Sequence, residues 1–221
     1  MLDNIIKIWM KYDYVFLEGL WGTLWLALIT VFFGTVLGTV VSLLRMSRWK
    51  GLYAVSSVYI EVLRGTPILL QLYFFWLLLP KVLPIEMSDT SCIVVALIIN
   101  SSSYVAEVIR AGIQAVDKGQ MEAARSLGLS GRGAMRWVIL PQAVKNILPA
   151  LGNEFIQMVK ETSLASVFFV GELMTSYKTV QSATYLALPS LLIVGIIYFA
   201  VTFLLSRAMK TLELRLKAGS C

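Results

Sequence analysis

Long apolar stretches separated by short polar segments dominate the chain. Two of them, residues 19–44 and 179–206, contain no charged side chain. A helix needs roughly 20 mostly apolar residues to cross the hydrocarbon core of a bilayer, so both stretches predict membrane spans. No stretch shows the alternation of apolar and polar residues that is typical of a membrane β-strand, and an open sheet cannot satisfy its backbone in lipid. The pattern therefore predicts an all-α membrane protein.

Three further stretches are apolar but carry ionisable residues near the middle or one end. They are residues 52–79 with Glu61 and Arg64, residues 90–112 with Glu107 and Arg110, and residues 147–170 with Glu154, Lys160 and Glu161. The basic residues decide how many of these stretches cross the membrane. With five spans and the N-terminus outside, twelve Lys and Arg residues fall in inside segments and four in outside segments, which is the bias that the positive-inside rule requires. We therefore expect five spans, at about residues 17–45, 52–79, 90–112, 147–170 and 179–207.

This arrangement divides the chain into three parts. We expect an external interfacial lead-in over residues 1–16, a single transmembrane domain over residues 17–212, and a cytoplasmic tail over residues 213–221. The lead-in mixes charged and apolar residues and has no apolar core of the kind found in cleavable signals. In the first span, Gly34 and Gly38 form a G-x-x-x-G pattern, which is typical either of generic close packing or of a specific dimer contact.

Composition narrows the function further. The 221 residues are 58% hydrophobic and contain no histidine, so the Ser-His and Cys-His dyads and most zinc sites are excluded and we expect no metal site. The net charge of +6 is spread over short loops rather than gathered in one patch, which argues against a nucleic-acid partner. The chain also lacks the G-x-x-x-x-G-K-[ST] loop that cradles ATP phosphates, so it is not expected to be an ATPase.

The segment 113–146, between the third and fourth predicted spans, is too polar to cross the membrane and too patterned to be disordered. Asp117 and Gln120 have the spacing of a capping box at a helix start, and Gly128 is a typical helix stop. A second segment follows over residues 134–140 and is expected to end at Pro141. The sequence therefore predicts a short cytoplasmic helix over about residues 119–128.

Met121, Ala124 and Leu127 share one face of this short helix at i, i+3, i+6 spacing. The small alanine side chain would let that face sit closely in a groove of a partner, with Glu122 and Arg125 flanking it. An ordinary surface helix with solvated charges has the same pattern, so periodicity alone leaves both interpretations open.

Several motifs resemble the permease subunits of bacterial ABC importers. Glu122-Ala123-Ala124, then Gly128, then Val138-Ile139-Leu140-Pro141 is similar to the EAA loop of that family, with valine at 138 where isoleucine is usual. Four further segments of the chain resemble the branch of the family that transports polar amino acids: Glu61–Pro67, Tyr104–Gly112, Gly152–Phe155 and Lys160–Leu164. The resemblance covers nearly the whole chain.

The resemblance implies a function and partners. The chain would be a multi-pass protein of the bacterial cytoplasmic (inner) membrane that moves a polar amino acid by alternating access. A dimer of a separate ATPase subunit, which holds ATP and magnesium, would grip the 119–128 helix. A second permease, either the same chain or a relative, and an extracytoplasmic amino-acid-binding protein would complete the transporter. The expected coupling residues are Glu122, Ala123, Ala124, Gly128, Leu140 and Pro141. A channel or scaffold subunit that uses no ATP is the alternative.

Polar and charged residues within the spans are the remaining candidates, because an ionisable group at bilayer depth must face protein, water or a partner charge. Two pairs at i, i+3 spacing, Glu61–Arg64 and Glu107–Arg110, are interpreted chiefly as structural ion pairs. Pro67 is expected to break the second span beside a cavity, as in many transporters. Lys160 is a candidate for neutralising a substrate carboxylate, and Glu161 or Glu154 for neutralising an ammonium group. The candidate substrate pathway consists of Thr66, Asn100, Ser103, Glu154, Gln157, Lys160 and Glu161.

Overall fold

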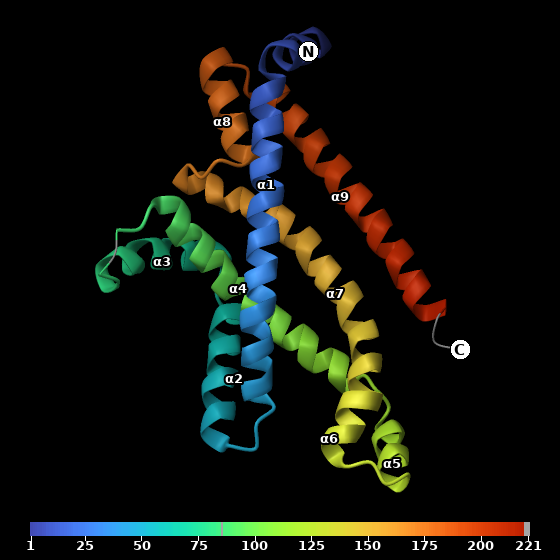
Figure 1. Cartoon of the computed structure of the whole chain (residues 1–221). Coiled ribbons are helices and arrows are strands. Elements are labelled where there is room, and N and C mark those ends of the chain that lie inside the picture. The colour runs from blue at the N-terminus through green and yellow to red at the C-terminus, as the bar shows by residue number, and fades with distance from the viewer. Residues whose placement is uncertain (85, 219–221) are drawn as a thin grey trace.

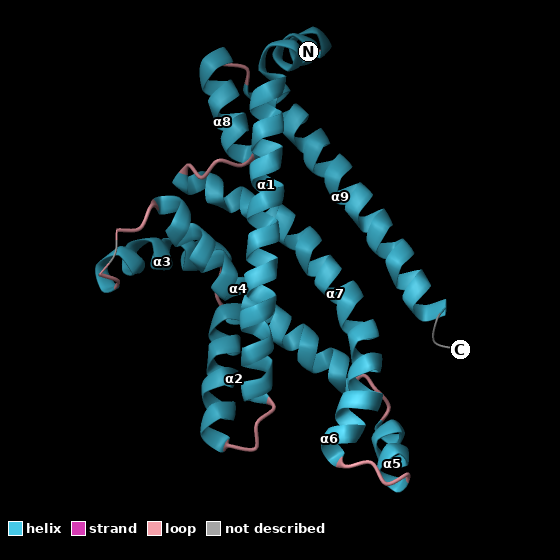
Figure 2. Ribbon diagram, in the orientation of Figure 1, coloured by secondary structure: helices cyan, strands magenta, loops and turns pink. Residues whose placement is uncertain are grey.

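Helices account for nearly all of the structure, a computed structural model that describes residues 1–84 and 86–218. No strand occurs within these residues (Figure 2). The elements are α1 (Leu2–Arg45), α2 (Lys50–Gly65), α3 (Ile68–Val82), α4 (Asp89–Gln114), α5 (Lys118–Ser126), α6 (Gly131–Ala134), the π-helical turn η1 (Met135–Ile139), α7 (Leu140–Glu161), the 3-10 helix η2 (Thr162–Phe168), α8 (Leu173–Thr184) and α9 (Ala187–Ala218). The predicted all-α class is therefore confirmed for the described residues.

A stripe of small residues on α1 lets two other helices approach it closely. A Cβ atom added at Gly38 would lie 2.7 Å from the backbone oxygen of Ser102 on α4, and one added at Gly34 would lie 2.9 Å from Ser101 Oγ. Nearer the N-terminus, a Cβ added at Gly19 would lie 2.1 Å from Ser176 Oγ on α8. The G-x-x-x-G pattern thus serves helix packing within this chain, because glycine is the residue that permits such close backbone approach.

Many large apolar side chains remain on the surface, as expected of a protein that faces lipid or partner subunits rather than water. They include Phe32, Phe33 and Val36 on α1 and Ile196, Phe199 and Leu204 on α9. Within the described residues, α1, α4 and α9 are long and apolar enough to cross a membrane, and α2 and α3 together make a fourth candidate if they count as one span. Helix α7 is not among these candidates.

The predicted span 52–79 is two helices rather than one. Helix α2 ends at Gly65 and α3 begins at Ile68, and their axes differ by 113°. Thr66 and Pro67 between them have extended backbone angles. A proline disfavours the helical conformation of the residue before it and has no N–H to donate, so the break falls where the sequence expected it.

The last predicted span, 179–207, also differs. Its first residues belong to α8, which ends at Thr184, and α9 begins at Ala187. Tyr185 separates the two helices in a left-handed conformation with φ 58°. Pro189 lies in the first turn of α9, where its missing N–H costs nothing. Hydropathy averages over this break because both flanking segments are free of charge.

Helical structure extends past both ends of the predicted transmembrane domain 17–212, whose bounds stay a prediction. Helix α1 runs through the predicted lead-in 1–16 and is kinked at Tyr12, whose φ of −128° is not helical. Helix α9 continues into the predicted tail as far as Ala218. The rest of that tail, residues 219–221, lies outside the described residues.

Two opposite ends of the molecule carry different elements (Figure 1). The N-terminus of α1 and helix α8 lie at one end. Helices α5 and α6 and the turn between α1 and α2 lie at the other, while α7 connects α6 to the middle of the molecule. A core cluster that includes Ala27, Leu72, Leu97 and Met158 fills the space where α1, α3, α4 and α7 meet.

Candidate functional site: a projecting helix and a central polar network

Helix α5 is built to project from the body of the protein. Asp117 caps its start, its carboxylate accepting a hydrogen bond from the Gly119 N–H at 2.6 Å. Gly128 has φ +87°, and the Leu129 N–H donates back to the Ala124 carbonyl at 3.2 Å. A left-handed glycine just beyond the last turn is a common helix stop. The short helix therefore begins and ends close to the predicted residues.

Two of the three residues on the face of α5 expected to dock on a partner, Met121 and Ala124, turn toward the protein itself. Ala124 is only 4% exposed, and Met121 packs against the apolar cluster formed by Val116, Ile139 and Ala143. Of the three residues on the predicted face, Leu127 is the exposed one, at 85%. The hydrophobic spacing therefore identified the face by which α5 packs against its own chain. Apolar side chains pack against the nearest apolar neighbours, and here those belong to the same chain.

The exposed face of α5 carries Glu122, Ala123, Arg125 and Leu127. Gly128 is also exposed, and a Cβ added there would meet nothing within 4 Å. The other two coupling candidates are Leu140 and Pro141. They begin α7, whereas the sequence predicted that the preceding segment ends there. The whole stretch from Gly131 to Glu161 is thus a continuous helical rod with one π-turn in it, since proline is well tolerated in the first turn of a helix.

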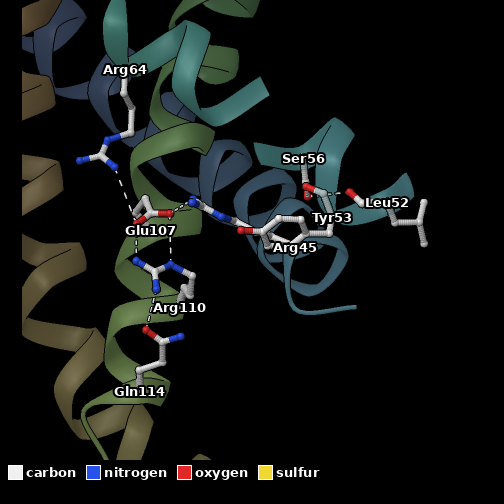
Figure 3. A network of polar contacts seen from close by, with 8 residues as sticks. All are labelled: Arg45, Leu52, Tyr53, Ser56, Arg64, Glu107, Arg110 and Gln114. Atoms are coloured by element: carbon white, nitrogen blue, oxygen red, sulfur yellow. Dashed lines mark hydrogen bonds and ion pairs between the residues drawn. The ribbon is translucent and has the colours of Figure 1, made fainter. Parts of the chain in front are cut away.

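A cluster of three arginines around one carboxylate joins α1, α2 and α4 (Figure 3). Glu107 on α4 accepts from Arg45 on α1 and from two nitrogens of Arg110, at 3.2 and 2.7 Å. Arg64 on α2 lies farther away, with its Nη1 3.7 Å from Glu107 Oε2. Its guanidinium also lies over the Tyr104 ring at 5.5 Å.

Arg64, predicted to pair with Glu61, has a different partner in the structure. In the described residues Arg64 pairs with Glu107 of a neighbouring helix, whereas Glu61 is exposed. The i, i+3 spacing places two side chains on one helix face, but the closer approach of α4 offers Arg64 a carboxylate that is more buried. Glu107 and Arg110 do pair, as the spacing predicted.

A polar network crosses the centre of the molecule. Asn100 Nδ2 on α4 donates to Gln71 Oε1 on α3 at 2.8 Å, and the neighbouring Ser101 Oγ donates to Glu154 Oε1 on α7 at 3.1 Å. Gln71, Asn100, Ser101 and Glu154 are all buried. Buried polar groups are stable when they are hydrogen-bonded, and here the partners come from three helices.

The predicted pathway residues separate into two groups in the structure. Asn100 and Ser103 are buried and bonded within the chain, Ser103 Oγ donating to the Asn100 carbonyl at 2.7 Å. Gln157 and Lys160 are exposed on α7, and Gln157 Nε2 donates to Glu161 Oε1 at 2.9 Å. Asn100 thus bonds to α3 and Ser103 bonds within α4 itself, and their place in a substrate pathway stays a prediction.

A cavity of about 440 Å³ lies beside the second group. It is lined by Lys160, Ser163, Leu164, Ser166, Val167, Met174 and Tyr198. A lysine and hydroxyl groups beside apolar walls make a polar side chain or a small zwitterion a suitable occupant.

Sequence reasoning missed two residues that the structure makes prominent. Gln71 is the single polar residue between Ile68 and Leu79, apart from a tyrosine hydroxyl and an indole N–H, and that isolation was its available signal. Glu172 precedes α8 and accepts hydrogen bonds from the Met174 and Thr175 N–H groups, both at 2.7 Å, and from Tyr198 Oη at 3.0 Å. Its role as a helix cap has no signal in hydropathy.

The fold and these sites define a class: an all-helical membrane protein with a broken helix pair at its centre and a capped helix projecting at one end. Residues 30–218 match the model of the family described as "Binding-protein-dependent transport system inner membrane component". The chain belongs to this family, whose members are multi-pass proteins of the cytoplasmic membrane that work with a separate ATPase subunit and a substrate-binding protein.

Relatives match over nearly their full lengths. The arginine transport system permease protein ArtQ of Bacillus subtilis (strain 168) is 40% identical over 92% of this chain and 93% of its own length. The putative glutamine transport system permease protein GlnP of Rickettsia conorii is 36% identical, covering 96% of this chain and 97% of the relative.

Two solved structures are similar in fold. An amino acid ABC transporter crystallised with histidines matches with a TM-score of 0.89 and 46% sequence identity, covering 93% of this chain and 96% of the other. An inward-facing structure of the MetNI methionine ABC transporter matches with a TM-score of 0.70, and covers 90% of this chain and 97% of that one. At 20% identity, the second supports the fold alone. The family predicted from the sequence motifs is confirmed.

Proposed function

We propose that the chain is the permease subunit of an ATP-driven importer for a polar amino acid. The observation that carries this proposal is helix α5, which is capped at both ends, seated on its own chain by Met121 and Ala124, and exposed along Glu122, Ala123 and Leu127. A short rigid helix presented in this way suits docking onto a second protein. The relatives named as arginine and glutamine permeases support a polar amino acid as the solute.

The orientation that we propose places α5 in the cytoplasm and the N-terminus outside. Figure 1 shows α5, α6 and the α1–α2 turn gathered at one end and the N-terminus at the other. The first end carries many of the basic residues, including Arg48, Lys50, Lys118, Arg125 and Arg132, which the positive-inside rule assigns to the cytoplasm. Five crossings are then made by α1, the α2–α3 pair, α4, α7 with η2, and α9.

Transport would follow from movement of the docked helix. Binding of ATP and magnesium closes the partner ATPase dimer and brings two such helices together, one from this chain and one from a second permease. Because η1 and α7 continue the same rod that begins beside α5, this movement tilts α7 within the membrane. An extracytoplasmic binding protein delivers the amino acid when the path opens outward.

Glu154, Gln157, Lys160 and Glu161 are the residues that we assign to the path. They lie on one rod, α7, where Gln157 and Lys160 are exposed and would face the second permease or the solute path, and Glu154 is buried behind them. Lys160 beside the cavity of about 440 Å³ suits a carboxylate, and Glu161 suits an ammonium group. Opposite charges so close together match a zwitterion, whose two charged groups are a few ångströms apart.

Affinity purification of the tagged chain from its native membrane in mild detergent tests the proposal, with mass spectrometry of every retained protein. Wild type is expected to retain an ATPase with a phosphate-binding loop, and Gly128→Asp and Glu122→Lys are expected to lose it. Gly128→Asp adds a charge at the docking surface and strains a backbone with φ +87°.

Gly51→Asp is the matched control. Gly51 is also exposed, a Cβ there also meets nothing within 4 Å, and no left-handed backbone is involved. An aspartate in the first turn of α2 is favourable, so this variant should keep the ATPase. If no ATPase accompanies the wild-type chain, the function shifts to a channel or scaffold that uses no ATP.

A further inference from the structure

The break between α2 and α3 is closed by a single side chain. Gln71 Nε2 donates to the Leu63 carbonyl at 2.7 Å, to Thr66 Oγ1 at 2.8 Å and to the Thr66 carbonyl at 3.2 Å. A broken helix leaves its last carbonyl groups without partners, and such groups are costly inside a bilayer. Gln71, which is 5% exposed, supplies from α3 the donors that α2 lost at Pro67.

The other end of the same amide reaches a third helix. Gln71 Oε1 accepts from Asn100 Nδ2 of α4 at 2.8 Å. Because the amide nitrogen must face two carbonyl groups, the oxygen is left facing Asn100, and the orientation of the side chain is determined by its partners. Gln71 thus connects the end of α2, the start of α3 and the middle of α4.

The next residue of α4 continues this connection to α7. Ser101 Oγ donates to Glu154 Oε1 at 3.1 Å, and α7 is the rod that begins at Leu140, directly after η1 beside α5. Two hydrogen bonds, made by the consecutive residues Asn100 and Ser101, therefore join α4 to the break on one side and to the α7 rod on the other, and the α4 backbone connects them.

The break itself has room to turn. A Cβ added at Gly65 would meet nothing within 4 Å, and only Thr66 and Pro67 separate the two helices. Hinges are formed by a few residues at the ends of elements that absorb a change in backbone angles. The bonds across this hinge are individually modest and exchangeable, so they can hold one angle and be remade at another.

We propose that Gln71 is a positioning residue for transport, which couples the α2–α3 hinge to movement of α7 through Asn100 and the Ser101–Glu154 bond. This inference rests on the proposed function. In an importer, ATP-driven movement of α5 would tilt α7, and the link would turn α3 against α2 in step. Without the link, α7 would still move and ATP would still be hydrolysed, but the hinge would no longer follow.

The test uses the complete transporter, with its ATPase and binding protein, in proteoliposomes. Radiolabelled arginine, glutamine and histidine are supplied in turn, and ATP hydrolysed and solute accumulated are measured in the same vesicles. Gln71→Leu should leave ATP hydrolysis per assembled complex within about twofold of wild type and lower the solute moved per ATP about tenfold, the scale expected for losing one or two buried hydrogen bonds.

Asn100→Leu separates coupling from folding. It removes the bond to α4 but leaves the bonds of Gln71 to Leu63 and Thr66 in place, so the α2–α3 break stays capped. This variant should lower the solute moved per ATP in the same way. The double variant Gln71→Leu/Asn100→Leu should be no worse than Gln71→Leu alone, because both single changes remove the same Gln71–Asn100 hydrogen bond. Gln181→Leu, a half-buried glutamine on α8, is the matched control and should behave as wild type.

Two results would overturn the inference. Unchanged solute per ATP in Gln71→Leu and Asn100→Leu would show that the hinge does not depend on this link. A parallel loss of hydrolysis and uptake in both variants would show that Gln71 and Asn100 serve only folding. Failure of the proposed function is distinct, because wild type itself would then show no ATP-dependent uptake.

Discussion

Removing the carboxylate of Glu107 should destabilise the protein strongly. Glu107→Gln keeps the shape of the side chain but leaves Arg45, Arg64 and Arg110 facing one another without a negative charge. The side chains of Arg45 and Glu107 are only 17% and 16% exposed, so water compensates little. Breaking a buried ion pair by removing one partner costs about 3–5 kcal/mol, and the partial exposure of Arg64 and Arg110 places the expected loss near the lower bound, at about 3 kcal/mol.

The geometry also ranks Arg110 above Arg64 in its contribution to stability. Arg110 makes two hydrogen bonds to Glu107, whereas Arg64 lies 3.7 Å away and is 44% exposed. Arg64→Gln should therefore cost no more than about 1 kcal/mol, the scale of an exposed ion pair. Arg110→Gln should cost about 2 kcal/mol, because charged hydrogen bonds are worth about 1.5–3 kcal/mol each and removing one arginine also relieves repulsion with the other two.

Thermal stability of the purified protein in mild detergent is the assay. About 3 kcal/mol corresponds to a fall of about 6–12 °C in the midpoint for a chain of this size. Glu61→Gln is the matched control, because Glu61 was also predicted to form an ion pair but is exposed. This variant should change the thermal midpoint by less than about 2 °C. Equal midpoints for Glu107→Gln and Glu61→Gln would refute the assignment of Glu107 as the centre of the cluster.

Two further predictions concern the path and the α8 cap. Lys160→Ala should weaken uptake several-fold while the complex still assembles, because it removes a positive charge beside the cavity without uncovering a core; unchanged uptake kinetics, compared with Lys81→Ala, would remove Lys160 from the path. Glu172→Ala should lower stability by about 2–3 kcal/mol, since two N–H groups and the Tyr198 hydroxyl lose their acceptor. Thermal midpoints measured beside those of the exposed Glu18→Ala test this cap, and identical midpoints would contradict it.

Much of the molecule could be predicted from local patterns. Runs of apolar residues longer than a bilayer is thick identified most of the long helices, and Pro67 marked the central break. Asp117 and Gly128 bounded the projecting helix because caps act through backbone geometry within a few residues. The EAA-like motif identified the family, since those residues occur together at a characteristic spacing.

Other features depend on which helices become neighbours. Hydropathy merged α8 and α9 into one span because an uncharged turn at Tyr185 leaves no polar signal. Periodicity on α5 found an apolar face, but only the position of η1 shows that Met121 and Ala124 pack inward. A single helix offered Glu61 as the partner of Arg64, and the approach of α4 replaced it with Glu107.

The sequence by itself therefore determined that the chain is an all-helical membrane protein, where the short helix α5 begins and ends, and which family the chain joins. The tertiary structure decided what each polar residue inside the membrane does. Gln71 and Glu154 are far from Asn100 and Ser101 in the chain, and their hydrogen bonds exist because α4 packs against both α3 and α7. A hydrogen bond requires two groups within about 3 Å, and no local pattern records the distance between groups on different helices.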